Sequence, residues 1–160
     1  MKPATILPVA AALLAASPAL AQKAAPADSK AVAACLEKAE GDGKYGGHCI
    51  GVIADPCIEV AKTKATYRED SKACAARELP VWNALMAEAI KRATRAVEKA
   101  KETAILESQK TFAASRDKLC PIYDQVDPDM AMGGANYCRL QETARRTLML
   151  RRLADAVNEH

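Results

Sequence analysis

Aromatic residues are scarce in this chain of 160 residues, which has one phenylalanine, one tryptophan and four tyrosines. Half of the residues are apolar, but 35 of these are alanine, so large apolar side chains are few. A core with so few large apolar side chains is thin and has to be closely packed. Covalent crosslinks would therefore add much to the stability of a domain of this size.

Histidine is almost absent, with His48 and the C-terminal His160 as the two examples, and no Cys-x-x-Cys pair occurs. Zinc sites and disulfide oxidoreductases usually rely on such residues, so neither class is expected. The sequence also lacks a histidine-based nucleophile arrangement, a phosphate-binding glycine loop after a strand, and paired carboxylates. Asp124, Asp127 and Asp129 do not have the spacing of a calcium-binding EF-hand. We predict a protein that is not an enzyme and has no metal or other cofactor.

Neither sign of charge is in large excess, since 23 basic residues stand against 20 acidic ones, a net charge of +3. Loss of an N-terminal leader containing Lys2 would leave 22 against 20, or +2. Proteins that bind nucleic acid are normally strongly basic. Nucleic acid is therefore not an expected partner.

The first 21 residues have the pattern of a secretory signal peptide. Lys2 supplies the positive start, an apolar stretch runs from Ile6 to Leu20, and Ala19-Leu20-Ala21 gives a small-x-small cleavage site before Gln22. The stretch is shorter than the roughly 20 apolar residues that span a bilayer, and prolines interrupt it. We therefore expect a periplasmic or secreted protein with no transmembrane segment after cleavage.

All six cysteines follow this leader: Cys35, Cys49, Cys57, Cys74, Cys120 and Cys138. In an exported chain they are expected to form disulfides rather than to bind a metal. The sequence leaves many pairings open, and sequential pairing is the simplest hypothesis. A Cys120–Cys138 bond would then staple a helical hairpin across its loop.

The N-terminal part of the mature chain is predicted to be only partly regular. Residues 22–34 would form a mobile leader and the start of a short helix, which runs from about Lys30 to Glu40 and is capped by Asp28 or Ser29. Residues 41–57 are rich in glycine and turn residues and predict an irregular segment held by disulfides.

Residues 35–160 are expected to form a single helical domain, because the mature chain is long enough for one core but hardly for two. After an interruption at Pro80, apolar and small residues recur every three to four positions and predict one helix from Val81 to about Cys120. Its charged face includes repulsive pairs four residues apart, Arg95–Lys99 and Glu98–Glu102.

A loop is expected over residues 121–137, followed by a second helix from about Asn136 to Glu159. With so short a connection, this helix would fold back antiparallel on the long helix. The predicted fold class is all-α: a disulfide-stapled hairpin of a long helix and its return helix, preceded by an irregular segment rich in cysteine and glycine.

A series of motifs runs through the helical region in a fixed order. They are Trp82 after Cys74, then Gln109, Phe112, Arg116-Asp117 and Cys120, then Gly133-Gly134, and finally Cys138, Thr143, Arg146 and Leu150. This order resembles the signature of the lysozyme-inhibitor LprI N-terminal domain family, with Phe112 where the family usually has tryptophan. The resemblance implies a small exported bacterial helical protein, in a family named after a member that inhibits lysozyme.

Some of these motif residues also have a structural interpretation. Phe112 falls on the apolar stripe, which favours core packing. Arg116 and Asp117 would lie in the last turn of the long helix, where the arginine suits the helix dipole and the aspartate does not. Asp117 therefore needs a partner, and Arg146 of the return helix is one candidate.

Two functions are compatible with these features. The first is a lysozyme-inhibitor-like binding protein, in which Asp124, Asp127 and Asp129 form an acidic loop without lysine or arginine that enters the cleft of a cationic enzyme. The alternative is that this loop is simply exposed to solvent, with aspartates that form turns and bind no partner. The second function is that of a structural or envelope-surface protein whose return helix contacts an anionic surface. The arginines of that helix are Arg139, Arg145, Arg146, Arg151 and Arg152. The alternative is that these arginines form a solvent-exposed basic face with no binding role.

Overall fold

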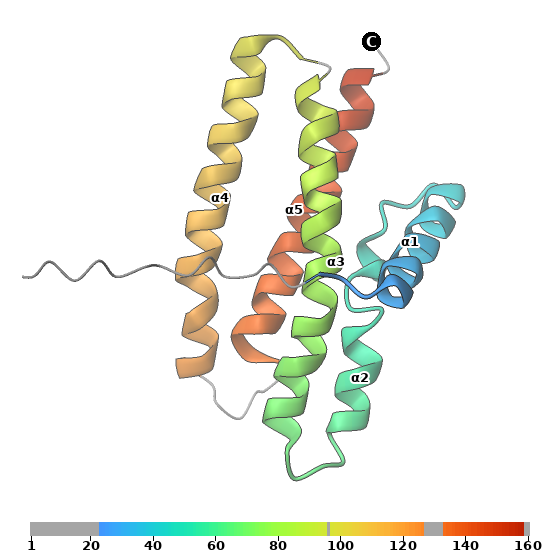
Figure 1. The fold of residues 1–160 in the computed structure, drawn as a ribbon, viewed down its shortest axis with the longest axis vertical. Helices are drawn as coiled ribbons and strands as arrows, with labels where there is room; N and C mark the ends of the chain where they lie inside the picture. The colour runs from blue at the N-terminus through green and yellow to red at the C-terminus, as the bar shows by residue number, and fades with distance from the viewer. Residues whose placement is uncertain (1–22, 96, 127–132, 159–160) are drawn as a thin grey trace, which may run out of the picture.

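The computed structural model describes residues 23–95, 97–126 and 133–158, and these residues form an all-helical fold without strands, as predicted (Figure 1). The elements are α1 (Pro26–Gly41), the short 3-10 helix η1 (Gly47–Cys49), α2 (Ala54–Ala61), α3 (Tyr67–Arg95), α4 (Lys99–Val126) and α5 (Gly134–Asn158). The predicted signal peptide, residues 1–21, lies outside the described residues.

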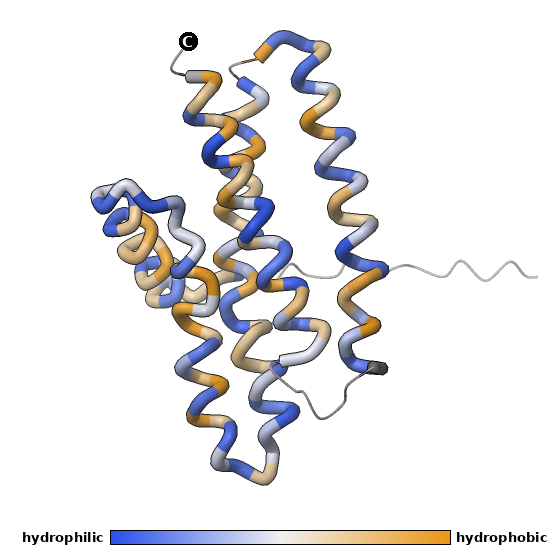
Figure 2. Tube along the Cα trace, turned by 180° about the vertical axis from the view of Figure 1, so that it is seen from behind, coloured by the Kyte–Doolittle hydropathy of each residue, from blue (hydrophilic) through white to orange (hydrophobic). Residues whose placement is uncertain are grey.

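Helices α3, α4 and α5 run up, down and up, so α4 is antiparallel to its two neighbours (Figure 1). The most extensive interface between elements joins α3 to α5, which lie side by side, and α4 contacts both of them less closely. Helices α1 and α2 lie on the opposite side of α3 from α4, as Figure 2 also shows from behind. The predicted antiparallel hairpin is therefore formed by α4 and α5, with α3 as a third long helix.

The main core lies between α1, α2, α3 and α5. Trp82 of α3 is its largest fully buried side chain. The apolar residues around it come from four helices: Val32 and Leu36 of α1, Ile58 of α2, Val81 of α3, and Leu140, Ala144 and Leu148 of α5. Helix α4 adds little to this core, because Cys120 is its one fully buried apolar residue in the described part of the chain.

The prediction of one continuous helix from Val81 to Cys120 is wrong. Helix α3 ends at Arg95 and α4 begins at Lys99. No glycine or proline marks this break, but it falls among the repulsive pairs Arg95–Lys99 and Glu98–Glu102, which weaken a helix by a few tenths of a kcal/mol each. Folding back places the half-buried side of α4, with Gln109 and Phe112, against α3 and α5.

Both prolines expected to interrupt or end a helix lie inside one. Helix α3 begins at Tyr67 and continues through Pro80, and α4 continues through Pro121 to Val126. Each proline removes one backbone hydrogen bond, yet both helices continue through it. As a consequence, Arg116 and Asp117 do not lie in the last turn of their helix, and the connection to α5 is shorter than predicted.

Helix α1 begins earlier than expected, at Pro26, with Ala25 as its N-cap residue. Proline suits the first helical position because its missing N–H would have no partner there. The predicted cap Asp28 lies instead in the first turn and is buried against α3. The glycine-rich stretch after α1 is also more regular than predicted, since it contains η1 and the start of α2.

Asp28 fixes α1 to α3 through a two-pronged ion pair with Arg77. Its carboxylate oxygens accept hydrogen bonds from Nε (2.8 Å) and Nη2 (2.5 Å) of the guanidinium. The hydrogen bond from Arg77 holds the pKa of the Asp28 carboxyl below its ordinary value, despite the opposing effect of burial. The ion pair therefore stabilises the fold above the carboxyl pKa of the unfolded chain, about 3.9, and less below it.

We expect Asp28→Asn to lower the free energy of unfolding at neutral pH, and the difference from the wild type to shrink as the pH falls below about 4. Urea denaturation at a series of pH values measures this difference. The exposed Asp42, which pairs with Lys44 in the surface turn, provides the control Asp42→Asn, whose effect should stay small throughout. A wild-type advantage over Asp28→Asn that is the same at pH 7 and pH 3 would contradict the prediction.

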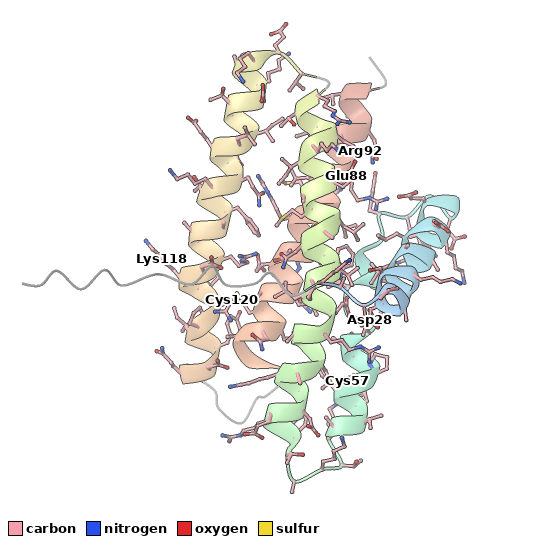
Figure 3. The ribbon with its side chains drawn as sticks, viewed as in Figure 1. Asp28, Cys57, Glu88, Arg92, Lys118 and Cys120 are labelled. Atoms are coloured by element: carbon pink, nitrogen blue, oxygen red, sulfur yellow. A yellow bond between two sulfur atoms is a disulfide. The ribbon has the colours of Figure 1, made fainter. Side chains whose placement is uncertain are left out.

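The predicted sequential disulfide pairing is confirmed. The structure contains the bonds Cys35–Cys49, Cys57–Cys74 and Cys120–Cys138. The first ties α1 to η1, the second ties α2 to α3, and the third ties α4 to α5; Figure 3 labels Cys57 and Cys120 on their helices. Each bond thus joins two elements that follow one another in the chain.

Candidate functional site

The Gly133-Gly134 motif allows α5 to begin close to α3 and α4. Gly133 has φ of +79°, and a Cβ atom there would lie 3.1 Å from the carbonyl oxygen of Ser71. Gly134 has φ of +50°, and a Cβ atom there would collide with the carboxylate of Asp124. Both the backbone conformation and the lack of space therefore require glycine at this end of the α4–α5 hairpin.

Asp124 is a structural residue at this hairpin end. It lies in α4, and its Oδ1 accepts hydrogen bonds from the backbone N–H of Ala135 (3.1 Å) and from Nζ of Lys72 (3.3 Å). The hydrogen bond from Ala135 is the main cause that lowers the pKa of this carboxyl, and Lys72 adds to it. Asp124 of the predicted acidic loop is thus already hydrogen-bonded to the N-terminus of α5. The other two aspartates of that loop, Asp127 and Asp129, lie outside the described residues.

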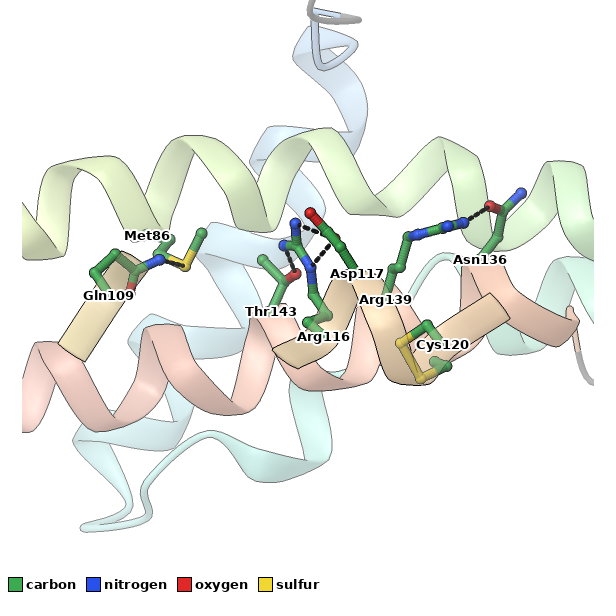
Figure 4. Close-up of polar contacts among 9 residues, drawn as sticks. Met86, Gln109, Arg116, Asp117, Cys120, Asn136, Arg139 and Thr143 are labelled. Atoms are coloured by element: carbon green, nitrogen blue, oxygen red, sulfur yellow. Dashed lines mark hydrogen bonds and ion pairs between the residues drawn. A yellow bond between two sulfur atoms is a disulfide. The ribbon is translucent and has the colours of Figure 1, made fainter. Parts of the chain in front are cut away.

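Arg116 bridges α4 and α5 one turn before the disulfide (Figure 4). Its Nη1 donates to Oγ1 of the buried Thr143 (2.9 Å), and its Nε and Nη2 donate to Oδ1 of the neighbouring Asp117. The partner of Asp117 is therefore Arg116, and the predicted ion pair between Asp117 and Arg146 is wrong. Asp117 and Arg146 do not reach each other, because Asp117 is exposed to solvent while Arg146 is hydrogen-bonded to Gln109 of α4.

Arg146 closes the same interface further along. Its guanidinium donates to Oε1 of Gln109 (3.1 Å) and Oγ of Ser108 (2.8 Å), and partial burial lowers its pKa. Gln109 in turn donates from Nε2 to the sulfur of Met86 on α3 (3.3 Å), as Figure 4 shows. A polar chain of contacts thus connects α5 to α3 across α4.

Phe112 lies between two guanidinium groups rather than in the main core. Its ring centroid is 5.8 Å from Cζ of Arg116 and 5.5 Å from Cζ of Arg146, and the side chain is half-buried. Such cation–π contacts contribute roughly 0.5–2 kcal/mol each, depending on exposure. The motif residues Gln109, Phe112, Arg116, Thr143 and Arg146 therefore form one interface, which we call the arginine seam.

The most heavily bonded buried carboxylate was not identified from the sequence. Glu78 of α3 is fully buried, and its Oε1 accepts from Nε1 of Trp82 (2.7 Å) and from the backbone N–H of Gly51 (2.9 Å). Its Oε2 accepts from the N–H groups of Ile53 (2.9 Å) and Ala54 (2.8 Å) at the start of α2. With four donors around it, Glu78 anchors the loop before α2 and has no free lone pair for proton transfer to a substrate. The four-residue spacing to Trp82 was the one signal available in the sequence.

A group of exposed apolar side chains lies on α4 beside the Cys120–Cys138 bond. Leu119, Ile122 and Tyr123 stand at positions i, i+3 and i+4 and so share one face of the helix. About half of each side chain is exposed, with Tyr123 the most accessible at 55%. We call these three residues the α4 apolar patch.

The arginines of α5 do not form one free basic face. Four of them have hydrogen-bonding partners within the protein: Arg139 with Asn136, Arg145 with Gln141 and Glu142, Arg146 in the arginine seam, and Arg151 with Glu40. Arg152 lies over the ring of Tyr45 instead. An anionic surface would have to compete with most of these contacts.

Three potential metal ligands meet near η1, but their sulfurs are not available. Cys35, His48 and Cys49 have ligand atoms within 4.8 Å of one another. Both cysteines are joined in a disulfide and therefore offer no thiolate. The exposed His48 alone is not a metal site.

These features define a small all-helical protein braced by disulfides, with a specific polar seam between its last two helices. The family model described as lysozyme inhibitor LprI matches residues 57–150, which is more than half of the chain. The chain belongs to this family, as the sequence motifs indicated. No curated protein and no solved structure matches it.

The matched region begins at Cys57, so it includes the second and third disulfides and the whole arginine seam, but neither α1 nor the Cys35–Cys49 bond. By its description the family consists of inhibitors rather than enzymes. The disulfides and the family together point to an extracytoplasmic protein. None of the helices in the described residues has the length and apolar character needed to cross a membrane.

Proposed function

We propose that the protein is exported by its N-terminal signal peptide and binds and inhibits a lysozyme-like enzyme that cleaves the cell wall. Membership of the lysozyme-inhibitor family over residues 57–150 is the observation that carries this proposal. The periplasm or the exterior of the cell is where such an enzyme and an exported inhibitor would meet. The protein would act by occupying the enzyme, without catalysis of its own.

The end of the α4–α5 hairpin is the surface that best fits this role. Tyrosine is a typical anchor of protein interfaces, and in the α4 apolar patch Tyr123 is flanked by two exposed aliphatic side chains that could complete the apolar centre of an interface. The Cys120–Cys138 bond beside the patch holds it rigid, which reduces the entropy lost on binding. The sequence between Cys120 and Cys138 contributes Asp127 and Asp129 and no lysine or arginine, which complements a cationic enzyme.

An assay of cell-wall lysis tests both the function and the surface. We expect the purified protein, in molar excess, to slow lysis by a cationic lysozyme. The double variant Ile122→Ser/Tyr123→Ser should weaken inhibition at least about tenfold, because loss of one anchor residue typically costs more than 1 kcal/mol. Leu106→Ser is the matched control, since Leu106 is an equally exposed apolar residue of α4 outside the patch.

The outcomes separate the two parts of the proposal. Undiminished lysis at a large molar excess of the wild-type protein would rule out inhibition of that lysozyme. Inhibition that Leu106→Ser and the double variant weaken equally would retain the function but place it on another surface. Circular dichroism before the assay verifies that each variant is folded.

A further inference from the structure

A second surface of the molecule lies between α5 and the loop that joins α1 to α2, and no residue of α4 lines it. It contains a groove of about 430 Å³, lined by Tyr45, Asp55, Tyr137, Gln141, Arg145 and Arg152. The nearly buried Leu148 lies beneath them. A volume of this order accommodates a small organic molecule. We call this feature the Tyr45 groove.

Tyr45 lines the groove and is 71% exposed. The guanidinium of Arg152 lies 4.6 Å from the centre of its ring. The backbone next to it is fixed, because Gly46 has φ of +74° and a Cβ atom there would lie 2.7 Å from Leu36 of α1. The Cys35–Cys49 bond closes the same loop. The exposed aromatic ring is therefore held in place before any ligand arrives.

The charges in the groove leave one cation available. Arg145 already binds Glu142 (3.0 Å) and Gln141 (2.6 Å), and the hydroxyl of Tyr137 donates to Oδ1 of Asp55 (2.7 Å). Within the described ranges, no carboxylate pairs with Arg152, whose recorded contact is the Tyr45 ring. Burial, followed by the bond to Asp55, raises the pKa of Tyr137, so its phenol stays a proton donor at neutral pH.

This arrangement offers three kinds of contact at once. Arg152 can form a charge-assisted pair with a carboxylate. Arg152 covers one face of the Tyr45 ring, so the ring offers its edge and its other face as apolar surface. Asp55 and Gln141 offer acceptors for hydroxyl groups. Asp55 would repel a ligand carrying several negative charges, such as a phosphate ester, so a single carboxylate on a polyhydroxylated ring fits best.

We propose that the Tyr45 groove is a binding site for a carboxylated sugar. The carboxylate lies against Arg152, the apolar face of the sugar ring lies on Tyr45, and sugar hydroxyls donate to Asp55 and Gln141. This site is independent of the proposed enzyme-binding surface on α4. A single sugar unit should bind with a dissociation constant of about 1 mM, since few atoms are in contact.

Titration of the ¹⁵N-labelled protein, with its disulfides intact, by glucuronic acid tests the proposal. We expect amide shifts confined to the loop around Tyr45 and to the turns of α5 that contain Gln141 and Arg152. Glucose, which has the same ring without the carboxylate, should bind at least about tenfold more weakly. Acetate, a carboxylate without the ring, should also bind at least about tenfold more weakly.

Two variants and a control locate the site. Arg152→Gln and Tyr45→Ala should each raise the dissociation constant for glucuronic acid about tenfold or more. Lys110→Gln removes the same charge from the exposed face of α4 and should leave binding within about twofold. The amide spectrum of each variant shows directly that it is folded.

Three results would overturn the proposal: no saturable shifts with glucuronic acid, equal binding of glucose, or an Arg152→Gln variant that binds like the wild type. Equal binding of acetate would remove the sugar from the proposal and leave an anion site. Lysis assays with Arg152→Gln should show unchanged enzyme inhibition, so that failure of one proposal is distinguishable from failure of the other.

Discussion

Replacing Glu78 by alanine is expected to lower the free energy of unfolding by about 3–5 kcal/mol, because it removes the acceptor of four buried hydrogen bonds. The variant would leave the indole N–H of Trp82 and three backbone N–H groups buried without an acceptor. Each buried unsatisfied donor costs roughly 1–3 kcal/mol, although local rearrangement and water entry recover part of the sum. The loop before α2 would lose its anchor on α3.

Urea denaturation with the disulfides intact measures this loss. Glu88→Ala is the matched control, since Glu88 lies on the same helix, is exposed and faces Lys91 at 3.9 Å (Figure 3). Its effect should stay within about 0.5 kcal/mol. If Glu78→Ala were no more destabilising than Glu88→Ala, the buried carboxylate would not be the anchor described here.

Removing the third disulfide with Cys120→Ser/Cys138→Ser is expected to cost about 3 kcal/mol by chain entropy, since the two cysteines are 18 residues apart. The loss should be concentrated in α4. Among the α4 residues whose burial the structure describes, Cys120 is the one fully buried apolar residue, and the helix otherwise depends on the half-buried arginine seam. Helices α3 and α5 keep their own extensive interface.

Hydrogen exchange with residue resolution shows where stability is lost. Amides of α4 should exchange much faster in the double variant, while those of α3 around Trp82 retain most of their protection. Cys35→Ser/Cys49→Ser is the control, because it removes a crosslink of similar span (14 residues) at the other end of the molecule. Uniform loss of protection in all helices of the Cys120→Ser/Cys138→Ser variant would contradict this account.

The sequence predicted what depends on local patterns. Sequential pairing of the cysteines was the simplest of many open hypotheses, and the structure contains it. The second hairpin helix was placed within two residues at its start and one at its end. The family resemblance followed from spaced motifs, and the match over residues 57–150 confirms it.

The sequence could not predict features set by contacts between distant residues. The turn between α3 and α4 contains neither glycine nor proline, so only the packing of α4 against α5 reveals it. Asp28 looked like a helix cap, and its real partner Arg77 lies 49 residues further on. Glu78 looked like any charged residue of an amphipathic helix, because the four N–H groups that surround it come partly from a segment about 25 residues away.

Asp124 illustrates a further difficulty for the candidate site. Three aspartates in a row of turn residues suggested a negatively charged loop, but the first of them is engaged at the start of α5. A count of charges in sequence does not show which of them are already neutralised within the fold. The α4 apolar patch was not predicted, because Leu119 was placed on an apolar stripe and Ile122 and Tyr123 were placed in a loop, whereas α4 continues to Val126.

Because the arginine seam attaches α4, the molecule has two parts that are held together by different kinds of contact. Close apolar packing holds α1, α2, α3 and α5 together as one block. Helix α4 is attached to that block by hydrogen bonds from arginine side chains to Thr143 and Gln109 and by one disulfide. The outer helix therefore has few apolar contacts to lose, and we expect it to open before the block around the tryptophan does.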